Sequence, residues 1–318
     1  MTDVRVSVIM AVYNASEFLD EAIGSVLGQT FPFFELILIN DYSTDNSAEI
    51  IRKYSNEDNR IVFLDNAQNL GRALTRNIGL DKARGKYIAI LDADDIAMPE
   101  RLDNQVRFLD TNPDVFLVGS GAIRIDEKGN KIGVHTPIID KDSVEERLKQ
   151  RNCIYHSSVM FRRTETRYRE KFPYSQDYDY YLQLLAAGKK LTNIPDHLIQ
   201  YRISSGAASW TNAVKQKLFA QKAKDFYNDS LIGLNNGYDE FYPESILNLD
   251  LTNSNDKLVL ETEIEALFKL SEFRKMRKIC RKYFSLFGIL NSFCVMYLLS
   301  FGGKRIVDLV RKNLKKVH

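Results

Sequence analysis

The feature that most constrains the fold is a short apolar run that ends in a cluster of three carboxylates. Residues 87–91 (Tyr-Ile-Ala-Ile-Leu) have the length and composition of a buried strand. Asp92, Asp94 and Asp95 follow directly, and their charges repel one another unless a divalent cation, a basic side chain or open water lies between them. Two aspartates at the carboxyl end of a strand can share one hard cation that keeps positions open for phosphate oxygens. A solvated acidic loop is the alternative.

Strand-like and helix-like segments alternate in the first third of the chain. The expected strands are 4–12, 35–40, 60–64 and 87–91, and the expected helices are 17–27, 47–54, 70–83 and 99–110. Such alternation predicts an α/β fold with a mostly parallel sheet and right-handed crossovers. Ligands of these sheets bind beyond the carboxyl ends of the strands. Tyr13, Asn14, Asp41 and the acidic cluster all lie there, so we expect them to meet at one rim.

The pattern changes near residue 210. Before that point we expect strands at 115–126, 157–162 and 198–203, a hairpin turn at 127–130, and helices at 143–150 and from 176 onward. After it the pattern is helical, with segments at 213–228, 256–270, 272–285 and 304–317. The sequence therefore predicts a domain over 1–210 and a helical C-terminal region over 211–318.

The C-terminal region is strongly basic, although the whole chain has a net charge of +2. Residues 274–316 contain twelve Lys or Arg residues and one acid, which leaves +11 there and −9 for the rest. Such a segment attracts anionic lipid, nucleic acid or an acidic partner; with no recognition module in view, we expect no nucleic acid. Residues 283–303 carry no charge and could form a helix or hairpin on a membrane face, a packed core or homo-oligomer contact, or a true span.

Cysteine content and the N-terminal sequence bear on the compartment. Cys153, Cys280 and Cys294 are few and far apart, so they indicate neither a disulfide framework nor a zinc site and suit a reducing compartment. The N-terminus runs directly into a strand without a signal-peptide pattern. We therefore expect a cytoplasmic protein that is peripheral at the inner face of the cell membrane.

Seven short motifs occur in order along the first 210 residues. They are Val6-Ser-Val-Ile-Met-Ala-Val-Tyr-Asn14, Gln29-Thr-Phe31, Asn40-Asp-Tyr-Ser-Thr-Asp45, Asn69-Leu-Gly-Arg72, Arg76-Asn-Ile-Gly79, Asp92-Ala-Asp-Asp95 and His156-Ser-Ser-Val-Met160. In order, spacing and residue type this region resembles the family 2 glycosyltransferases, which have the Rossmann-like GT-A fold. Two competing phosphate-binding patterns, G-x-x-x-x-G-K-[ST] and G-x-G-x-x-G after the first strand, do not occur.

The resemblance implies a UDP-sugar donor. Ala11 and Tyr13 would lie along the nucleotide base, where a tyrosine ring can pack on uracil. Asn14 and Ala93 would also border the nucleotide. Asp41 would accept a hydrogen bond from the uracil N3–H, which favours UDP over GDP; a turn-stabilising role is the alternative.

The resemblance also implies a divalent cation, Mn²⁺ or Mg²⁺. Asp94 would ligate it, and Asp92 would contact the ribose or metal-bound water. Arg76 would reach the phosphate or base side of the nucleotide, although it could instead be a charge on a helix surface. Asn40 and Tyr42 stand where the family usually has Asp and Gly. Because a bulky side chain resists positive φ, Tyr42 argues against a left-handed turn there.

Inverting transfer needs a base that deprotonates the attacking hydroxyl opposite the leaving group. The resemblance assigns this role to Asp177, for which a helix N-cap is the alternative. Asp179 is the rival, but at helical spacing its side chain would point elsewhere. Gln176 stands where relatives commonly have a Glu that contacts the acceptor, so it would affect acceptor choice. His156 and Ser157 would line the donor-sugar pocket; a structural core histidine is the alternative.

Many relatives carry a histidine metal ligand after the last strand, but this chain has Ser204 there. Asp94, diphosphate and water would then hold the cation, and Arg202 would take over part of the charge neutralisation. The implied function is transfer of a sugar from a UDP-sugar to a hydroxyl of a glycan or lipid-linked saccharide in cell-surface polysaccharide synthesis. A non-catalytic nucleotide-sugar-binding module and a transferase with a non-UDP donor are the alternatives.

Overall fold

The computed structural model describes residues 4–203, 210–234, 237–249, 255–269, 271–288 and 292–303. The chain divides into two compact units. The first comprises Met1–Ser204 with Ala223–Phe241, and the second comprises Ser205–Lys222 with Tyr242–His318. The predicted Ser204 position and the helix expected at 304–317 lie outside the described residues.

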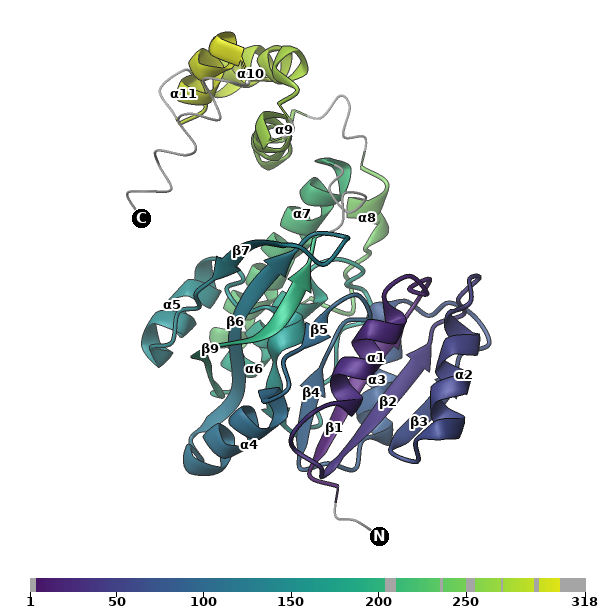
Figure 1. The fold of residues 1–318 in the computed structure, drawn as a ribbon. Helices are drawn as coiled ribbons and strands as arrows, with labels where there is room; N and C mark the ends of the chain where they lie inside the picture. Colours follow the sequence, from purple (N-terminus) through teal and green to yellow (C-terminus); the bar gives the residue numbers. More distant parts are fainter. Residues whose placement is uncertain are drawn as a thin grey trace. The chain divides into compact units, whose positions relative to one another are not determined.

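In the described part of the first unit, nine strands form one sheet in the order β3-β2-β1-β4-β8-β6-β9-β5, with β7 paired to β6 (Figure 1). The strands are β1 (Val6–Val12), β2 (Phe34–Asn40), β3 (Ile61–Asp65), β4 (Tyr87–Ile90), β5 (Ile96–Ala97), β6 (Val115–Ile125), β7 (Lys131–His135), β8 (Met160–Arg162) and β9 (Lys190–Arg202). β1 pairs in parallel with β2 and β4, and β2 pairs in parallel with β3. The predicted α/β fold is confirmed.

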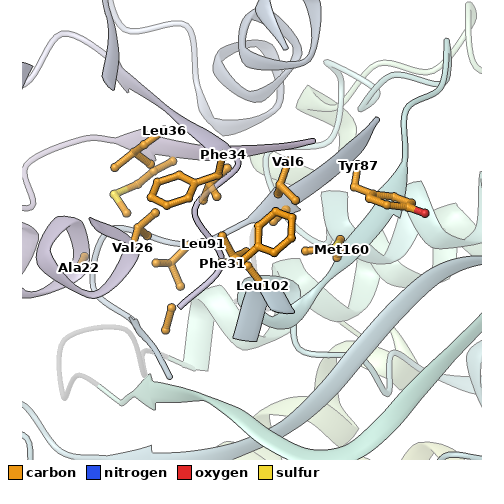
Figure 2. Packing of buried hydrophobic residues seen from close by; sticks show 14 of the residues in the cluster. Val6, Ala22, Val26, Phe31, Phe34, Leu36, Tyr87, Leu91, Leu102 and Met160 are labelled. Carbon is orange, nitrogen blue, oxygen red and sulfur yellow. The ribbon is translucent and has the colours of Figure 1, made fainter. Parts of the chain in front are cut away.

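Helices cover both faces of the parallel half of the sheet. The helices of this unit are α1 (Leu19–Leu27), α2 (Ser47–Glu57), α3 (Arg72–Lys82), α4 (Arg101–Thr111), α5 (Lys141–Gln150) and α6 (Gln176–Ala186). Val6, Val8 and Met10 of β1 share a core cluster with Val26 of α1, and Figure 2 shows Val6 and Val26 in that cluster. Ile9 points to the other face and meets α3. A Cβ atom at Gly79 would lie 2.6 Å from the Ile9 Cγ2 atom, so glycine permits this close approach of α3.

The second half of the sheet differs from the mostly parallel arrangement that was predicted. β8 runs antiparallel to β4 and β6, while β6 and β9 are parallel. β9 begins at Lys190, whereas the strand was expected to begin at 198. The earlier part was missed because Pro195 and Asp196 interrupt the apolar pattern, at the point where the register with β6 shifts. β8 begins at Met160, after the 3₁₀ turn His156–Ser158. The two-residue strand β5 is too short for periodicity to reveal.

The second unit is helical, as predicted for the C-terminal region. Its helices are α8 (Glu244–Leu247), α9 (Lys257–Lys269), α10 (Phe273–Phe287) and α11 (Ser292–Leu299), and α7 (Trp210–Leu231) contributes residues to both units. Leu260 and Ile264 of α9 pack with Met276 and Cys280 of α10 and with Phe293 of α11 in a small core.

The uncharged run 283–303 is divided between α10 and α11. Gly288 follows α10 with a φ of 85°. Tyr283 and Phe293 lie in the small core, whereas Leu298 and Phe301 are exposed. In the described ranges no helix has the length and apolar character needed to cross a membrane.

Candidate functional site

The acidic cluster follows β4, and each of its carboxylates has a different environment. Asp92 is paired with Arg76 of α3, whose Nη2 lies 2.6 Å from Asp92 Oδ1. Burial by itself would raise the pKa of Asp92, but the Arg76 guanidinium, followed by His156 and Arg72, lowers it to about 2. Asp92 is therefore an anion whose compensating cation comes from the protein. Arg76 is 4% exposed, so it is not a charge on a helix surface.

Asp95 is buried and ties the acidic loop to the end of β9. Its Oδ1 accepts a hydrogen bond from the backbone N–H of Arg202 at 2.8 Å. Burial, followed by the carboxylates of Asp94 and Asp92, raises the pKa of Asp95 well above its usual value. Burial also lowers the pKa of the neighbouring Arg101 to about 9, and Asp95 opposes that change. Asp95 thus has a structural environment rather than a substrate-facing one.

Asp94, unlike Asp92, has no ion-pair partner among the described residues, although the charges of Arg72 and Arg202 act on it. It is half-buried. Burial, followed by the charge of Asp92, raises the pKa of Asp94. A bound cation would offset that cost, so the site fits Mn²⁺ or Mg²⁺. The described part of the chain holds no group of three or more His, Cys, Asp or Glu side chains placed for a metal. That Asp94 and Asp92 hold the cation together with phosphate and water stays a prediction.

Arg202 braces the acidic loop from β9. Its Nε donates to the carbonyl oxygen of Asp94 at 2.9 Å, and its Nη2 donates to Glu21 at 2.6 Å. Its Nη1 donates to the carbonyl oxygens of Asp126 and Glu127 at 3.2 and 3.1 Å. These bonds fix the backbone beside Asp94. Neutralisation of a diphosphate by Arg202 stays a prediction, and it would require some of these bonds to break.

The loops after β1 and β2 are joined by hydrogen bonds at the rim where the nucleotide is expected. Ser43 Oγ accepts from the backbone N–H of Asn14 at 3.0 Å, and Asn14 Oδ1 accepts from the N–H of Thr44 at 2.8 Å. Asn14 thus connects the two loops, whereas Tyr13 is 53% exposed. Tyr42 adopts a φ of 63°, so the prediction that its bulk prevents a left-handed turn is wrong. The bonds between the two loops hold the strained backbone.

Two alanines assigned to the nucleotide lie close to this rim. Ala11 is half-buried near the end of β1, in register with Ile39 of β2. Ala93 is buried between Asp92 and Asp94. Both residues are alanines, and their small side chains leave space for a ligand to approach the backbone beside them. Their contact with the nucleotide stays a prediction.

Asp41 is almost completely buried, and its carboxylate accepts hydrogen bonds from the loop before α3. Asp41 Oδ1 accepts from the N–H of Leu70 at 2.8 Å and from Asn66 Nδ2 at 3.0 Å. Asp41 Oδ2 accepts from the N–H of Gly71 at 2.9 Å. These bonds support a loop-stabilising role, which was the alternative for this residue. The uracil contact stays a prediction.

Replacing Asp41 by alanine separates these two roles. The N–H groups of Leu70 and Gly71 would lose their acceptor, so we expect the free energy of unfolding to fall by about 1–3 kcal/mol. If Asp41 also binds the uracil N3–H, UDP affinity should fall more than the affinity for CDP, which lacks that donor. Denaturant unfolding and calorimetry measure both effects. Equal affinity losses for UDP and CDP would leave Asp41 with the structural role alone.

Asp177 is the second residue of α6 and is an electrostatic neighbour of the Arg76–Asp92 pair. Its Oδ2 accepts from Asn152 Nδ2 at 2.7 Å. Burial raises the pKa of Asp177, Arg76 opposes that shift, and Asp92 adds to it. Ser175 occupies the N-cap position, with a φ of 53°, so Asp177 is not the N-cap. Arg76 Nη1 is buried without a hydrogen-bond partner, so the two N–H groups of this nitrogen are unpartnered near the predicted base.

Asp179 points away from this group. Its Oδ1 accepts from Arg169 Nη1 at 2.9 Å, and its Oδ2 accepts from Gln183 Nε2 at 2.9 Å. Burial raises the pKa of Asp179 to about 6, and Arg169 limits the rise. Gln176, by contrast, is buried beside Asp177 with its Oε1 unpartnered, so its predicted acceptor contact is compatible with its hydrogen bonding.

His156 is buried, and both of its ring nitrogens are engaged. Nδ1 lies 2.8 Å from the Tyr181 hydroxyl, and Nε2 lies 3.2 Å from the Tyr168 hydroxyl. Burial, followed by nearby Arg76, lowers the pKa of His156 to about 3, so the ring is neutral. These contacts support the core-histidine alternative. Ser157 Oγ accepts from the backbone N–H of Asp92 at 3.2 Å, which places it against the acidic cluster.

Sequence reasoning missed the segment that supports Arg76. The Tyr168 ring centroid lies 5.8 Å from the Arg76 guanidinium. The side chain of Asn77 holds the Tyr168 backbone by accepting from its N–H and donating to its carbonyl oxygen, both at 2.9 Å. Asn77 directly follows Arg76 in one of the seven motifs, which was the available signal.

Comparison with known proteins identifies the family. Residues 7–169 match the family model of glycosyl transferase family 2. An uncharacterized glycosyltransferase of Methanocaldococcus jannaschii is 38% identical over 221 residues, which cover 68% of this chain and 76% of that protein. The Escherichia coli UDP-Glc:alpha-D-GlcNAc-diphosphoundecaprenol beta-1,3-glucosyltransferase WfaP is 34% identical over 208 residues, which cover 64% of this chain and 79% of WfaP.

A solved structure shares the fold. S. aureus TarS in complex with UDP-GlcNAc matches with a TM-score of 0.58 and 16% sequence identity, over 89% of each chain. The TarS complex with UDP matches with a TM-score of 0.57 over the same shares. The order of the parallel strands, the acidic cluster after β4 and the family match agree with one another. This chain therefore belongs to glycosyl transferase family 2 and is a glycosyltransferase with a GT-A-type fold.

Proposed function

We propose that this enzyme transfers a sugar, with inversion at the anomeric carbon, from a UDP-sugar to a hydroxyl of a glycan or lipid-linked saccharide. The observation that carries the proposal is the set of charges around Arg76. This buried guanidinium pairs with Asp92 and is a neighbour of Asp177, while Asp94 forms no ion pair in the described chain. Inverting transfer uses one carboxylate as a base and others to hold a cation at the leaving group.

In this mechanism Asp177 takes the proton of the acceptor hydroxyl as that oxygen attacks the anomeric carbon. A bond forms between the acceptor oxygen and this carbon, the bond to the phosphate oxygen breaks, and UDP leaves with the electron pair. The raised pKa of Asp177, caused first by burial, makes it a stronger base than an exposed carboxylate. Asp94 and Asp92 would hold Mn²⁺ or Mg²⁺, which when bound neutralises charge on the diphosphate. Asn152 orients the base.

The substrate classes are supported by the similar proteins. TarS was solved with UDP and with UDP-GlcNAc, and the name of WfaP specifies UDP-Glc and a diphosphoundecaprenol-linked acceptor. For this chain we infer a UDP-sugar donor and a role in cell-surface polysaccharide synthesis. The exposed Tyr13 ring at the end of β1 is available to pack on the base.

A donor screen tests this function. The full-length protein is incubated with UDP-, GDP-, CDP- and dTDP-sugars, with and without Mn²⁺, and release of the nucleotide is measured. We expect metal-dependent release of UDP from one UDP-sugar. If only a GDP-, CDP- or dTDP-sugar is turned over, that sugar nucleotide replaces the UDP-sugar as the assigned donor. Binding of a UDP-sugar without turnover against any acceptor would favour a non-catalytic binding module.

We further propose that residues 1–210 form the catalytic domain and that 211–318 attach it to an anionic membrane. α10 contains no acidic residue, and its exposed face carries Arg274, Lys275, Lys278 and Arg281. Leu298 and Phe301 are 64% and 61% exposed. Exposed cations and exposed apolar side chains together suit a surface of anionic lipid, at the inner face of the cell membrane. A homo-oligomer that covers the apolar side chains is the alternative.

Vesicle flotation of the full-length protein distinguishes membrane attachment from a homo-oligomer. We expect binding to vesicles that contain anionic lipid, with a salt-sensitive part, because the surface potential decays within a Debye length of about 8 Å at physiological ionic strength. The double variant Leu298→Ser, Phe301→Ser should lose the salt-resistant part. Ile132→Ser in β7, where the side chain is 53% exposed, is the matched control and should bind normally. Protein that remains unbound at low salt and elutes as an oligomer would contradict membrane attachment.

A further inference from the structure

Tyr42 combines a strained backbone with an exposed ring. Its φ of 63° lies in the left-handed region, which a bulky side chain avoids. The residue is 54% exposed, so burial of the ring does not offset the strain. Glycine adopts this conformation without a steric penalty. The aromatic side chain therefore raises the energy of the fold and adds little to its core, which indicates a role outside folding.

The surrounding loops hold Tyr42 in this conformation. Besides the bonds that join Asn14 to Ser43 and Thr44, Asp45 Oδ2 accepts from the N–H of Ser16 at 3.0 Å. Within its own loop, Asn40 Oδ1 accepts from the N–H of Ser43 at 3.2 Å. Strained residues persist when neighbouring contacts determine the backbone around them, as these bonds do. The backbone that carries the ring is thus fixed before any ligand arrives.

Tyr42 and Tyr13, the residue whose ring is expected to pack on the nucleotide base, follow adjacent strands. β1 and β2 are parallel neighbours, with Val12 in register with Asn40. Tyr13 follows one strand, and Tyr42 follows the other after Asp41. The hydrogen bond from Asn14 to Ser43 joins the residues that come next in each loop. Two exposed aromatic side chains therefore lie on two hydrogen-bonded loops at the carboxyl ends of adjacent strands.

We propose that Tyr42 binds the nucleobase of the donor, so that the base contacts two aromatic side chains, Tyr13 and Tyr42. This inference rests on the proposed UDP-dependent transfer. Aromatic side chains stack on bases through the π-face that every base has, and a backbone fixed in advance leaves only the side-chain torsions of Tyr42 to be ordered on binding. The base is favoured over the acceptor sugar because Tyr42 directly follows Asp41, at the strand end where the ligands of parallel sheets bind.

Titrations of the full-length wild type and two variants test the proposal. Stacking on one base is worth about a 5- to 150-fold change in affinity. Tyr42→Gly should weaken UDP and uridine by that factor, and Tyr42→Phe, which keeps the ring, should stay within about twofold of wild type. Inhibition by inorganic pyrophosphate should not change, because the ring meets the base. Without ligand, Tyr42→Gly should unfold at a higher temperature, because it removes left-handed strain.

Ser271→Gly is the matched control for the strain. Ser271 also has a positive φ, 59°, and this variant should keep the wild-type affinity for UDP. Unchanged UDP and uridine affinities in Tyr42→Gly, with wild type binding UDP, would overturn the inference and leave the proposed function intact. A loss confined to the acceptor KM would also overturn it and assign the ring to the acceptor. A wild type that binds neither UDP nor any UDP-sugar would overturn the proposed function itself.

Discussion

Asp177→Asn is expected to slow sugar transfer by about 10² to 10⁴ while UDP-sugar affinity stays near that of wild type. The amide cannot take the proton of the attacking hydroxyl, but its oxygen can still accept the hydrogen bond that Asn152 donates at 2.7 Å. The fold should not be destabilised, because burial disfavours the carboxylate that is removed. Single-turnover transfer at saturating donor and calorimetry measure the two quantities. A variant with more than half of the wild-type rate would remove Asp177 from the role.

Asp179→Asn is the control from the same helix. Asp179 forms a buried pair with Arg169, and removal of one partner of such a pair costs on the order of 3 kcal/mol of unfolding free energy. We expect this variant to be less stable but to transfer sugar at the wild-type rate per folded molecule. Stable protein with a rate as low as that of Asp177→Asn would make Asp179 the base.

The pH profile tests the base independently. Burial, the largest cause, holds the pKa of Asp177 above the usual 3.8. Only the deprotonated carboxylate can accept the hydroxyl proton, so the rate should fall as the pH falls through this raised pKa. The residual rate of Asp177→Asn should lack that acidic limb. An identical limb in the variant would mean that another group titrates.

The position of the site could be predicted from the sequence because its residues follow strands. Parallel strands end at the same edge of a sheet, and β1, β2 and β4 are neighbours in the order found. Tyr13, Asp41 and Asp92 were therefore placed at one rim from periodicity alone. Asp177 had no such support, and its identification depended on the resemblance to the family.

The partners of these residues could not be predicted, because they depend on contacts between distant segments. Arg202 bonds to the acidic loop through a strand whose register with β6 is irregular, and periodicity contains no information on such shifts. The bonds of His156 to Tyr168 and Tyr181 likewise depend on how α6 and residues 164–171 pack. The prediction for the backbone of Tyr42 was wrong for a related reason. The energetic cost of a positive φ was known, but the hydrogen bonds between the loops that hold this conformation could not be seen in the sequence.

Asp94→Asn is expected to change function and stability in opposite directions. An amide supplies no charge to a hard cation, so the Mn²⁺-dependent part of UDP affinity should be lost. In the absence of metal the free energy of unfolding should rise, because the half-buried Asp94 carboxylate has Asp92 and Asp95 as like-charged neighbours and no ion pair within the described chain. A gain would be informative because most substitutions destabilise by 0.5–3 kcal/mol. Calorimetry with UDP, with and without Mn²⁺, and denaturant unfolding measure the two effects.

Asp92→Asn is the contrasting variant, two positions away. It would leave the Arg76 guanidinium buried without its ion-pair partner, so we expect a loss on the order of 3 kcal/mol of unfolding free energy. Both variants should weaken Mn²⁺-dependent UDP binding, but Asp94→Asn alone should gain stability. Unchanged Mn²⁺-dependent affinity in Asp94→Asn would remove Asp94 from the metal site. A destabilised Asp94→Asn would mean that the protein already compensates this carboxylate, and the reason to expect a cation beside it would then be lost.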